Sequence, residues 1–169
     1  MQRITFSSNL TVDHAVSLPE FQNSYDVDGL TNWGTKNTSM KNYDNVGDFF
    51  GNGITAINSL SIQVGKEKVQ TYFSYANTTA SGIIDANKLY KHNLALRETA
   101  TLFNDKLTLD ANVNLISQTI KDRPTSGGYY MNPLVGLYTF PRGKDMSEYR
   151  DNYEVFDEGR NLPLQNWYT

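Results

Sequence analysis

The sequence predicts an all-β fold: an antiparallel meander of about five long strands, each with one apolar and one polar face. Three observations predict it. Apolar residues recur at every second position in several segments, which is the period of a strand and not of a helix. Only 38% of the 169 residues are hydrophobic and the mean hydropathy is −0.53, so an ordinary soluble core would be thin. Short connections at one end of the sheet alternate with long ones at the other.

The first strand is expected over Gln2–Val12. There, the apolar side chains of Ile4, Phe6, Leu10 and Val12 alternate with arginine, threonine and asparagine. Such alternation is typical of a strand whose two faces meet different surroundings. The segment is also close to the roughly 9–11 residues that a tilted strand needs to cross a bilayer.

A hairpin is expected next. Its first strand ends at the polar turn Gly65–Lys68, a length suited to a tight connection, and its second strand returns from that turn. The more apolar face of this hairpin is expected to carry Leu60, Ile62, Val64, Thr71, Phe73 and Tyr75.

The fourth strand is expected within Asn93–Phe103 and the fifth over Leu107–Gln118, joined by the turn Asn104–Lys106. The fifth shows the clearest alternation, with leucine, alanine and valine at every second position. In the fourth, Glu98 falls on the apolar face, and a β-bulge or a place near a rim is expected to accommodate it.

The remaining connections are expected to be long: Asp13–Asn52, Thr78–His92 and Thr119–Thr169. One short amphipathic helical turn is expected in the last of them, within Met146–Phe156. Long structureless loops count against a compact soluble domain. Short turns at one end of a sheet and long loops at the other are the layout of an outer-membrane barrel.

The composition of the second face supports a membrane strand. It is mostly serine, threonine, asparagine and glutamine, which suits a polar lumen, while the apolar face suits lipid. Five strands cannot close a barrel, and an open edge in lipid leaves backbone groups unpaired. The chain is therefore expected to be part of a larger barrel. The alternative is a soluble carbohydrate-binding β-sandwich that buries the Leu107–Leu115 face against a second sheet.

No enzyme is expected. His14 and His92 are the only histidines and lie far apart, cysteine is absent, and no pair of carboxylates stands out as a hydrolase pair. These residues also predict neither a cofactor nor a metal site. The charge of 15 minus 18, or −3, has no basic block, so nucleic acid is not an expected partner.

Loop aromatics are the candidate substrate-binding residues, because aromatic rings beside asparagine and aspartate often hold sugars. The alternative is that these rings form an interfacial girdle or pack the loops together. The candidates are Trp33, Tyr43, Phe49 and Phe50 in the first long loop and Tyr129, Tyr130 and Tyr138 in the last.

Four segments carry a resemblance to a known family: "SLPEFQNSYD" (Ser17–Asp26), Asn42–Ile84 with "NYDNVGDFFGNGITAINSLSIQVG", Lys91–Gln118 with "KHNLALRETATLFNDKLTLDANVNLISQ", and Asn132–Trp167 with "NPLVGLYTFPRGKDMSEYRDNYEVFDEG". In this order they resemble consecutive barrel blocks of the SusC/RagA-type TonB-dependent outer-membrane transporters. The resemblance covers nearly the whole chain.

The resemblance implies a place in a 22-stranded transmembrane β-barrel with long extracellular loops. Complete members also carry a signal peptide, an N-terminal plug and further strands, which residues 1–169 are expected to lack. The implied activity is uptake of glycans or oligopeptides across the outer membrane of Bacteroidota-type cells. The implied partners are a SusD-like surface lipoprotein, the TonB complex acting through the N-terminal parts, and outer-membrane lipid. This segment would supply barrel wall and the loops that face substrate or lid.

Overall fold

The computed structural model describes residues 2–26, 28, 33–37, 41, 43–124 and 132–165. The chain divides into two units. One consists of Met1–His14 and Gly51–Arg123, and the other of Ala15–Phe50 and Pro124–Thr169.

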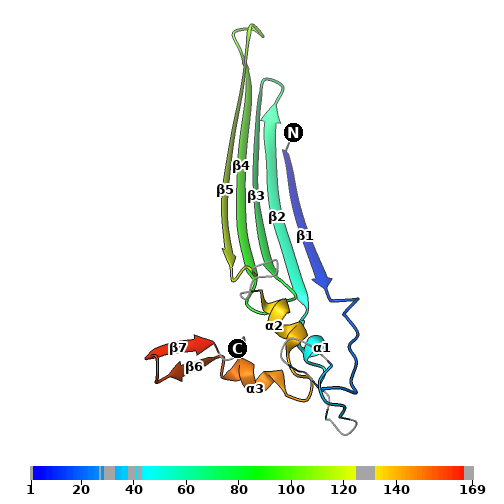
Figure 1. Ribbon diagram of the computed structural model, residues 1–169. Helices are drawn as coiled ribbons and strands as arrows, with labels where there is room; N and C mark the ends of the chain where they lie inside the picture. The colour runs from blue at the N-terminus through cyan, green and yellow to red at the C-terminus, as the bar shows by residue number, and fades with distance from the viewer. Residues whose placement is uncertain are drawn as a thin grey trace. The chain divides into compact units, whose positions relative to one another are not determined.

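The first unit is a single antiparallel sheet whose five strands lie side by side in sequence order (Figure 1). The strands are 12 to 15 residues long, more than twice the typical length in soluble proteins. They are β1 (Gln2–Asp13), β2 (Gly53–Lys66), β3 (Val69–Ser81), β4 (Lys88–Leu102) and β5 (Leu107–Lys121). The predicted all-β meander of five long strands is confirmed.

The register of the sheet sorts its side chains into two faces. The apolar face contains the row Ile4, Ile62, Phe73, Leu96 and Val113, and the next row Phe6, Leu60, Tyr75, Leu94 and Leu115. The polar face contains the row Arg3, Gln63, Tyr72, Arg97 and Asn112, and the next row Thr5, Ser61, Ser74, Ala95 and Asn114. The two faces expected from the alternation are therefore present on all five strands.

Within the first unit, no described residue covers the apolar face. Phe6 is 69% exposed, Leu115 61% and Val113 50%. Among the described residues the only buried apolar side chains are Leu137 and Met146, and both belong to the second unit. The β-sandwich alternative requires a second sheet over the Leu107–Leu115 face. The described residues of the first unit form no such sheet.

The connection between β3 and β4 is shorter than predicted. A long loop was expected over Thr78–His92, but β3 continues to Ser81 and β4 begins at Lys88, which leaves only residues 82–87 between them. Asn77, Thr78 and Thr79 pair with His92, Lys91 and Tyr90 through the backbone ladder. That expectation was wrong because ladder hydrogen bonds need no apolar side chains, so strand ends that are polar on both faces resemble a loop.

Glu98 does not lie at a β-bulge. The pairing of β4 with both neighbours is continuous through this residue, so the expected bulge is wrong. Instead the hydroxyl of Thr71, directly opposite on β3, donates a hydrogen bond of 2.6 Å to the Glu98 carboxylate. A cross-strand partner accommodates the charge without a break in the ladder.

The second unit contains short elements joined by turns: α1 (Asn45–Phe49), α2 (Pro133–Thr139), α3 (Met146–Asp151), β6 (Glu154–Asp157) and β7 (Leu162–Gln165). Each helix begins after a residue whose side chain accepts a hydrogen bond from the first turn, namely Asp44, Asn132 and Asp145. The helical turn expected within Met146–Phe156 is confirmed for α3. The end of that segment belongs instead to β6, which pairs with β7.

None of the helices among the described residues is long and apolar enough to cross a membrane.

Candidate functional site

A cleft of about 550 Å³ is present in the second unit. Its walls come from the segment at residues 18–23, the residues that lead into α1, and the end of α2 with the turn that follows it. The side chains that define its chemistry are Glu20, Phe21, Tyr43, Tyr138, Phe140 and Arg142.

Local hydrogen bonds hold the first wall of this cleft. The Gln22 side chain accepts hydrogen bonds from the backbone amides of Ser24 and Tyr25, both at 2.8 Å, and donates one to the Tyr25 carbonyl at 2.9 Å. This closes a tight turn directly after Phe21. The Phe21 ring thereby lies against Tyr138 of α2, with ring centroids 5.9 Å apart.

The second wall contains Tyr43 and Arg142. The Tyr43 amide donates a hydrogen bond of 3.0 Å to the Arg142 carbonyl, so residues nearly 100 positions apart share this wall. A ring contact ties it to the first wall. The guanidinium carbon of Arg142 lies 4.5 Å from the centroid of the Phe21 ring. Phe21 therefore contacts both an aromatic ring and a cation.

Arg142 is the cationic side chain of the cleft. Its Nη1 is enclosed by protein and has no hydrogen-bond partner, and no described carboxylate forms an ion pair with it. Burial lowers the pKa of the Arg142 guanidinium. The side chain as a whole is half-buried and borders the cleft. The cleft thus combines a guanidinium with aromatic rings, which is a combination that suits oxygen-rich ligands.

The predicted aromatic residues do not form one site. Tyr43 lines the cleft, with Lys41 Nζ 4.4 Å from its ring centroid. Trp33 is 70% exposed and contacts Tyr25 at 5.5 Å. Phe49 and Phe50 contact each other edge to face at 5.1 Å and do not line the cleft.

Tyr129 and Tyr130 lie outside the described residues. Of the predicted residues that the structure describes, Tyr43 and Tyr138 belong to the cleft.

Sequence reasoning missed Phe21, Phe140 and Arg142. Phe21 lies more than 100 residues from the other two, and no spacing rule links a loop residue to such a distant partner. A signal was present in the segment Tyr138–Arg142, where two aromatic residues and an arginine flank a proline. That grouping of ring and cation in a turn was not recognised as a site.

The polar face of the sheet offers a smaller groove of about 480 Å³, which borders Gln63, Tyr72, Arg97 and Asn112. Arg97 Nε donates to one oxygen of Asp110 at 3.1 Å, and its Nη2 donates to the other oxygen. This is a two-pronged ion pair between β4 and β5. Within the described ranges, no group of three or more histidine, aspartate or glutamate side chains has the arrangement of a metal site.

Acid is expected to weaken the start of α3. The Ser147 hydroxyl and amide both donate to Asp145, at 2.7 and 2.9 Å, and they hold the pKa of this carboxyl below its ordinary value of 3.8. A depressed pKa stabilises the folded state fully above pH 3.8, and the contribution is lost as pH falls through the lower folded value. Protection of the Ser147 amide from hydrogen exchange, corrected for intrinsic rates, should therefore fall below about pH 4.

Asp145→Asn should remove this acid dependence, whereas Asp151→Asn, at the other end of α3, should keep it. An unchanged pH profile in the Asp145 variant would contradict the assigned role.

No protein-family model matches the chain, and no curated protein is significantly similar to it. Its function is therefore inferred from its residues and from the geometry of the two units.

Proposed function

We propose that this chain is a segment of a SusC/RagA-type TonB-dependent transporter of the bacterial outer membrane, which imports glycans or oligopeptides. The sheet supplies barrel wall, with its apolar face in lipid and its polar face in the lumen. The second unit supplies loops that face the substrate or the lid. The observation that carries this proposal, beside the resemblance of the four sequence blocks, is the exposed apolar face of five long strands whose opposite face is polar.

The belt is the set of apolar side chains on the apolar face. One end of the sheet, the hairpin end, holds the β2–β3 and β4–β5 turns, and the other, the loop end, holds the β3–β4 connection. Toward the loop end the belt stops at one row on all five strands, and the next row is polar throughout: Ser8, Asn58, Asn77, His92 and Ser117. Beyond this polar row, β1 and β2 again carry apolar residues up to Val12 and Ile54, whereas β5 carries Lys121 there.

The width of the belt fits the placement of this face in lipid. On β5 it spans nine residues, Leu107–Leu115, with leucine, alanine or valine at every second position. A strand tilted by about 45° crosses the hydrocarbon layer in about 9–11 residues.

The polar face and the edges of the sheet also favour a barrel. The polar face carries the Arg97–Asp110 ion pair, whose side chains are 57% and 46% exposed and suit an aqueous lumen. β1 and β5 form the two edges of the sheet. In lipid each edge would require a further strand, which a closed barrel provides.

Glu98 opposes this interpretation, because it lies within the belt on β4, where lipid disfavours a charge. The side chain is only half-exposed, and Thr71 donates a hydrogen bond to its carboxylate. These contacts reduce the cost without removing it. The membrane placement thus rests on the apolar residues around it, which include Leu96 on β4 and Leu109, Ala111 and Val113 on β5.

The cleft in the second unit suits the proposed loop role. Aromatic rings and the guanidinium of Arg142 offer stacking surfaces and hydrogen-bond donors, which both sugars and peptides use. The further partners follow from the resemblance: a SusD-like lipoprotein over the loops and the TonB complex acting through the N-terminal parts of the transporter.

Uptake measurements test the proposed function. Deletion of the gene that encodes this chain should abolish growth of its bacterium on one class of glycan or oligopeptide, while growth on the corresponding monomer continues. Removal of TonB should have the same effect, because outer-membrane uptake of this type draws its energy through TonB. Recovery of the protein in the soluble fraction, with unchanged uptake of every polymer tested, would overturn the proposal.

A further inference from the structure

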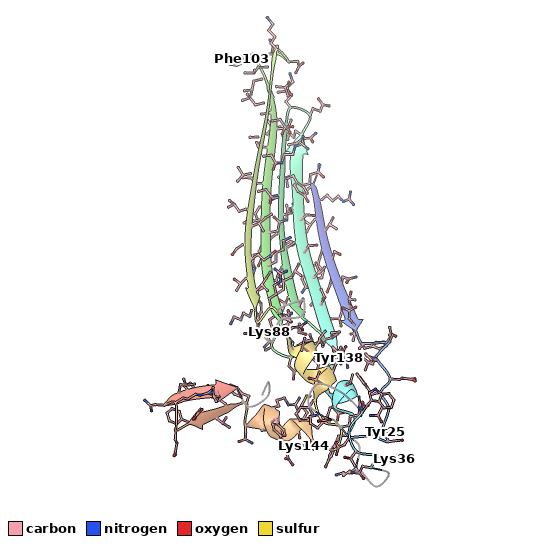
Figure 2. The ribbon with its side chains drawn as sticks, viewed as in Figure 1. Tyr25, Lys36, Lys88, Phe103, Tyr138 and Lys144 are labelled. Carbon is pink, nitrogen blue, oxygen red and sulfur yellow. The ribbon has the colours of Figure 1, made fainter. Side chains whose placement is uncertain are left out.

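Two lysines face each other on the apolar face at the loop end of the sheet. Lys88 of β4 and Lys121 of β5 are direct cross-strand partners, so their Cβ atoms are expected to lie about 4.5–5.5 Å apart. Figure 2 places Lys88 at this end, opposite the hairpin tip that carries Phe103. Both lysines are exposed, and neither forms an ion pair within the described part of the chain. Like charges in this position repel, so the pair favours an anion between them.

The side chains between the belt and this pair change in a definite order. Above the last apolar pair, Leu94 and Leu115, come first His92 and Ser117, then Tyr90 and Thr119, and finally the two lysines. The Tyr75 hydroxyl, on the neighbouring strand, lies 2.8 Å from His92 Nδ1, so this aromatic side chain directs its polar end toward the polar row. Apolar, then aromatic and hydroxyl, then cationic is the order that an interface between lipid and water selects.

We propose that Lys88 and Lys121, with the Tyr90 hydroxyl beside them, bind the phosphate of a phosphorylated lipid in the outer leaflet. This inference rests on the proposed function, because it requires the apolar belt to lie in lipid. It adds a specific binding site for an anionic lipid to a wall that otherwise contacts hydrocarbon chains.

The pair lies at a suitable height above the belt. Lys121 follows Leu115, the last belt residue of β5, by six residues, and Lys88 is its partner on β4. Six residues correspond to about 20 Å along the strand, or about 14 Å in height at the roughly 45° tilt of strands in outer-membrane barrels. Lysine side chains are long enough to reach back toward the headgroup layer from this height.

Vesicle binding of the full chain tests the inference. The chain is mixed with neutral phosphatidylcholine vesicles or with vesicles that also contain lipid A, and the bound fraction is measured by flotation. One lysine near an anionic surface contributes about fivefold, so the preference for lipid A vesicles should be about 30-fold. Lys88→Gln/Lys121→Gln should lose most of this preference, and Lys88→Arg/Lys121→Arg should keep it.

A matched control removes the same charge elsewhere. Lys91 lies on the polar face of β4 and Lys106 in the β4–β5 turn at the hairpin end, so Lys91→Gln/Lys106→Gln should retain the preference for lipid A. Equal loss in both double glutamine variants, or no loss in Lys88→Gln/Lys121→Gln, would overturn the site while the bound chain still supports the membrane wall. Failure of the unmodified chain to bind either vesicle would overturn the proposed function as well.

Discussion

Val113→Arg is expected to destabilise the membrane-inserted protein by about 2–3 kcal/mol, whereas Asn112→Arg should change its stability by less than about 0.5 kcal/mol. The two residues are neighbours on β5 but lie on opposite faces of the sheet, and Val113 is near the middle of the belt. An arginine in the lipid-facing belt loses its hydration, while an arginine on the polar face remains in water. The measurement is the urea dependence of protease protection in native outer membranes.

The comparison between the two variants decides the outcome. The matched arginine on the polar face controls for size, charge and the loss of a strand residue. Equal losses in both variants, or a larger loss for Asn112→Arg, would contradict the assignment of the two faces, because a soluble protein with a buried polar face would respond in that way.

Asn45→Leu is expected to lower the local stability of the second unit by about 2–4 kcal/mol. Asn45 is 8% exposed, and its side chain links α1 to the start of α3. Its Nδ2 donates to the Lys144 carbonyl at 2.9 Å and its Oδ1 accepts from the Met146 amide at 3.0 Å. Leucine has a similar size but leaves both backbone groups unsatisfied in a buried place.

Hydrogen exchange at the Met146 amide measures this effect, because the free energy of local opening sets the exchange rate. Asn45→Asp is the matched control. It keeps the acceptor for Met146 and removes only the donor to Lys144, so about half of the loss is expected. Unchanged protection of Met146 in Asn45→Leu would show that the link does not hold this part of the second unit together.

The sheet was predictable from the sequence because its strongest signal is local. On β5, alternation over Leu107–Leu115 specifies both the strand and its faces. The signal disappears where a polar row crosses the apolar face, as at Asn77 and His92, and there the strand ends were misread as a loop. Pairing with the neighbouring strand extends these ends. The sequence of one strand does not show which residues it pairs with.

The cleft was only partly predictable, since it depends on contacts between distant segments. Tyr43 was recognised as a loop aromatic, but its role follows from the hydrogen bond to Arg142. The helix α2 was also missed, although Asn132 and Pro133 are residues typical of a helix start. Its glycine and aromatic residues resemble a loop, and the preceding cap was the only local signal for helix.

The contact between the apolar face and lipid is tested most directly by single cysteines along β5, for which the cysteine-free chain gives no background. Each residue from Leu109 to Leu115 is replaced in turn in native outer membranes. Labelling by a water-soluble maleimide is measured in one sample, and in another the fluorescence of a membrane-permeant thiol dye attached to the cysteine is measured with and without a lipid-bound nitroxide. Lipid contact predicts quenching without labelling at Leu109, Ala111, Val113 and Leu115, and labelling at the positions between them. Protection of these four positions from both reagents would mean that protein covers them, and would contradict the account.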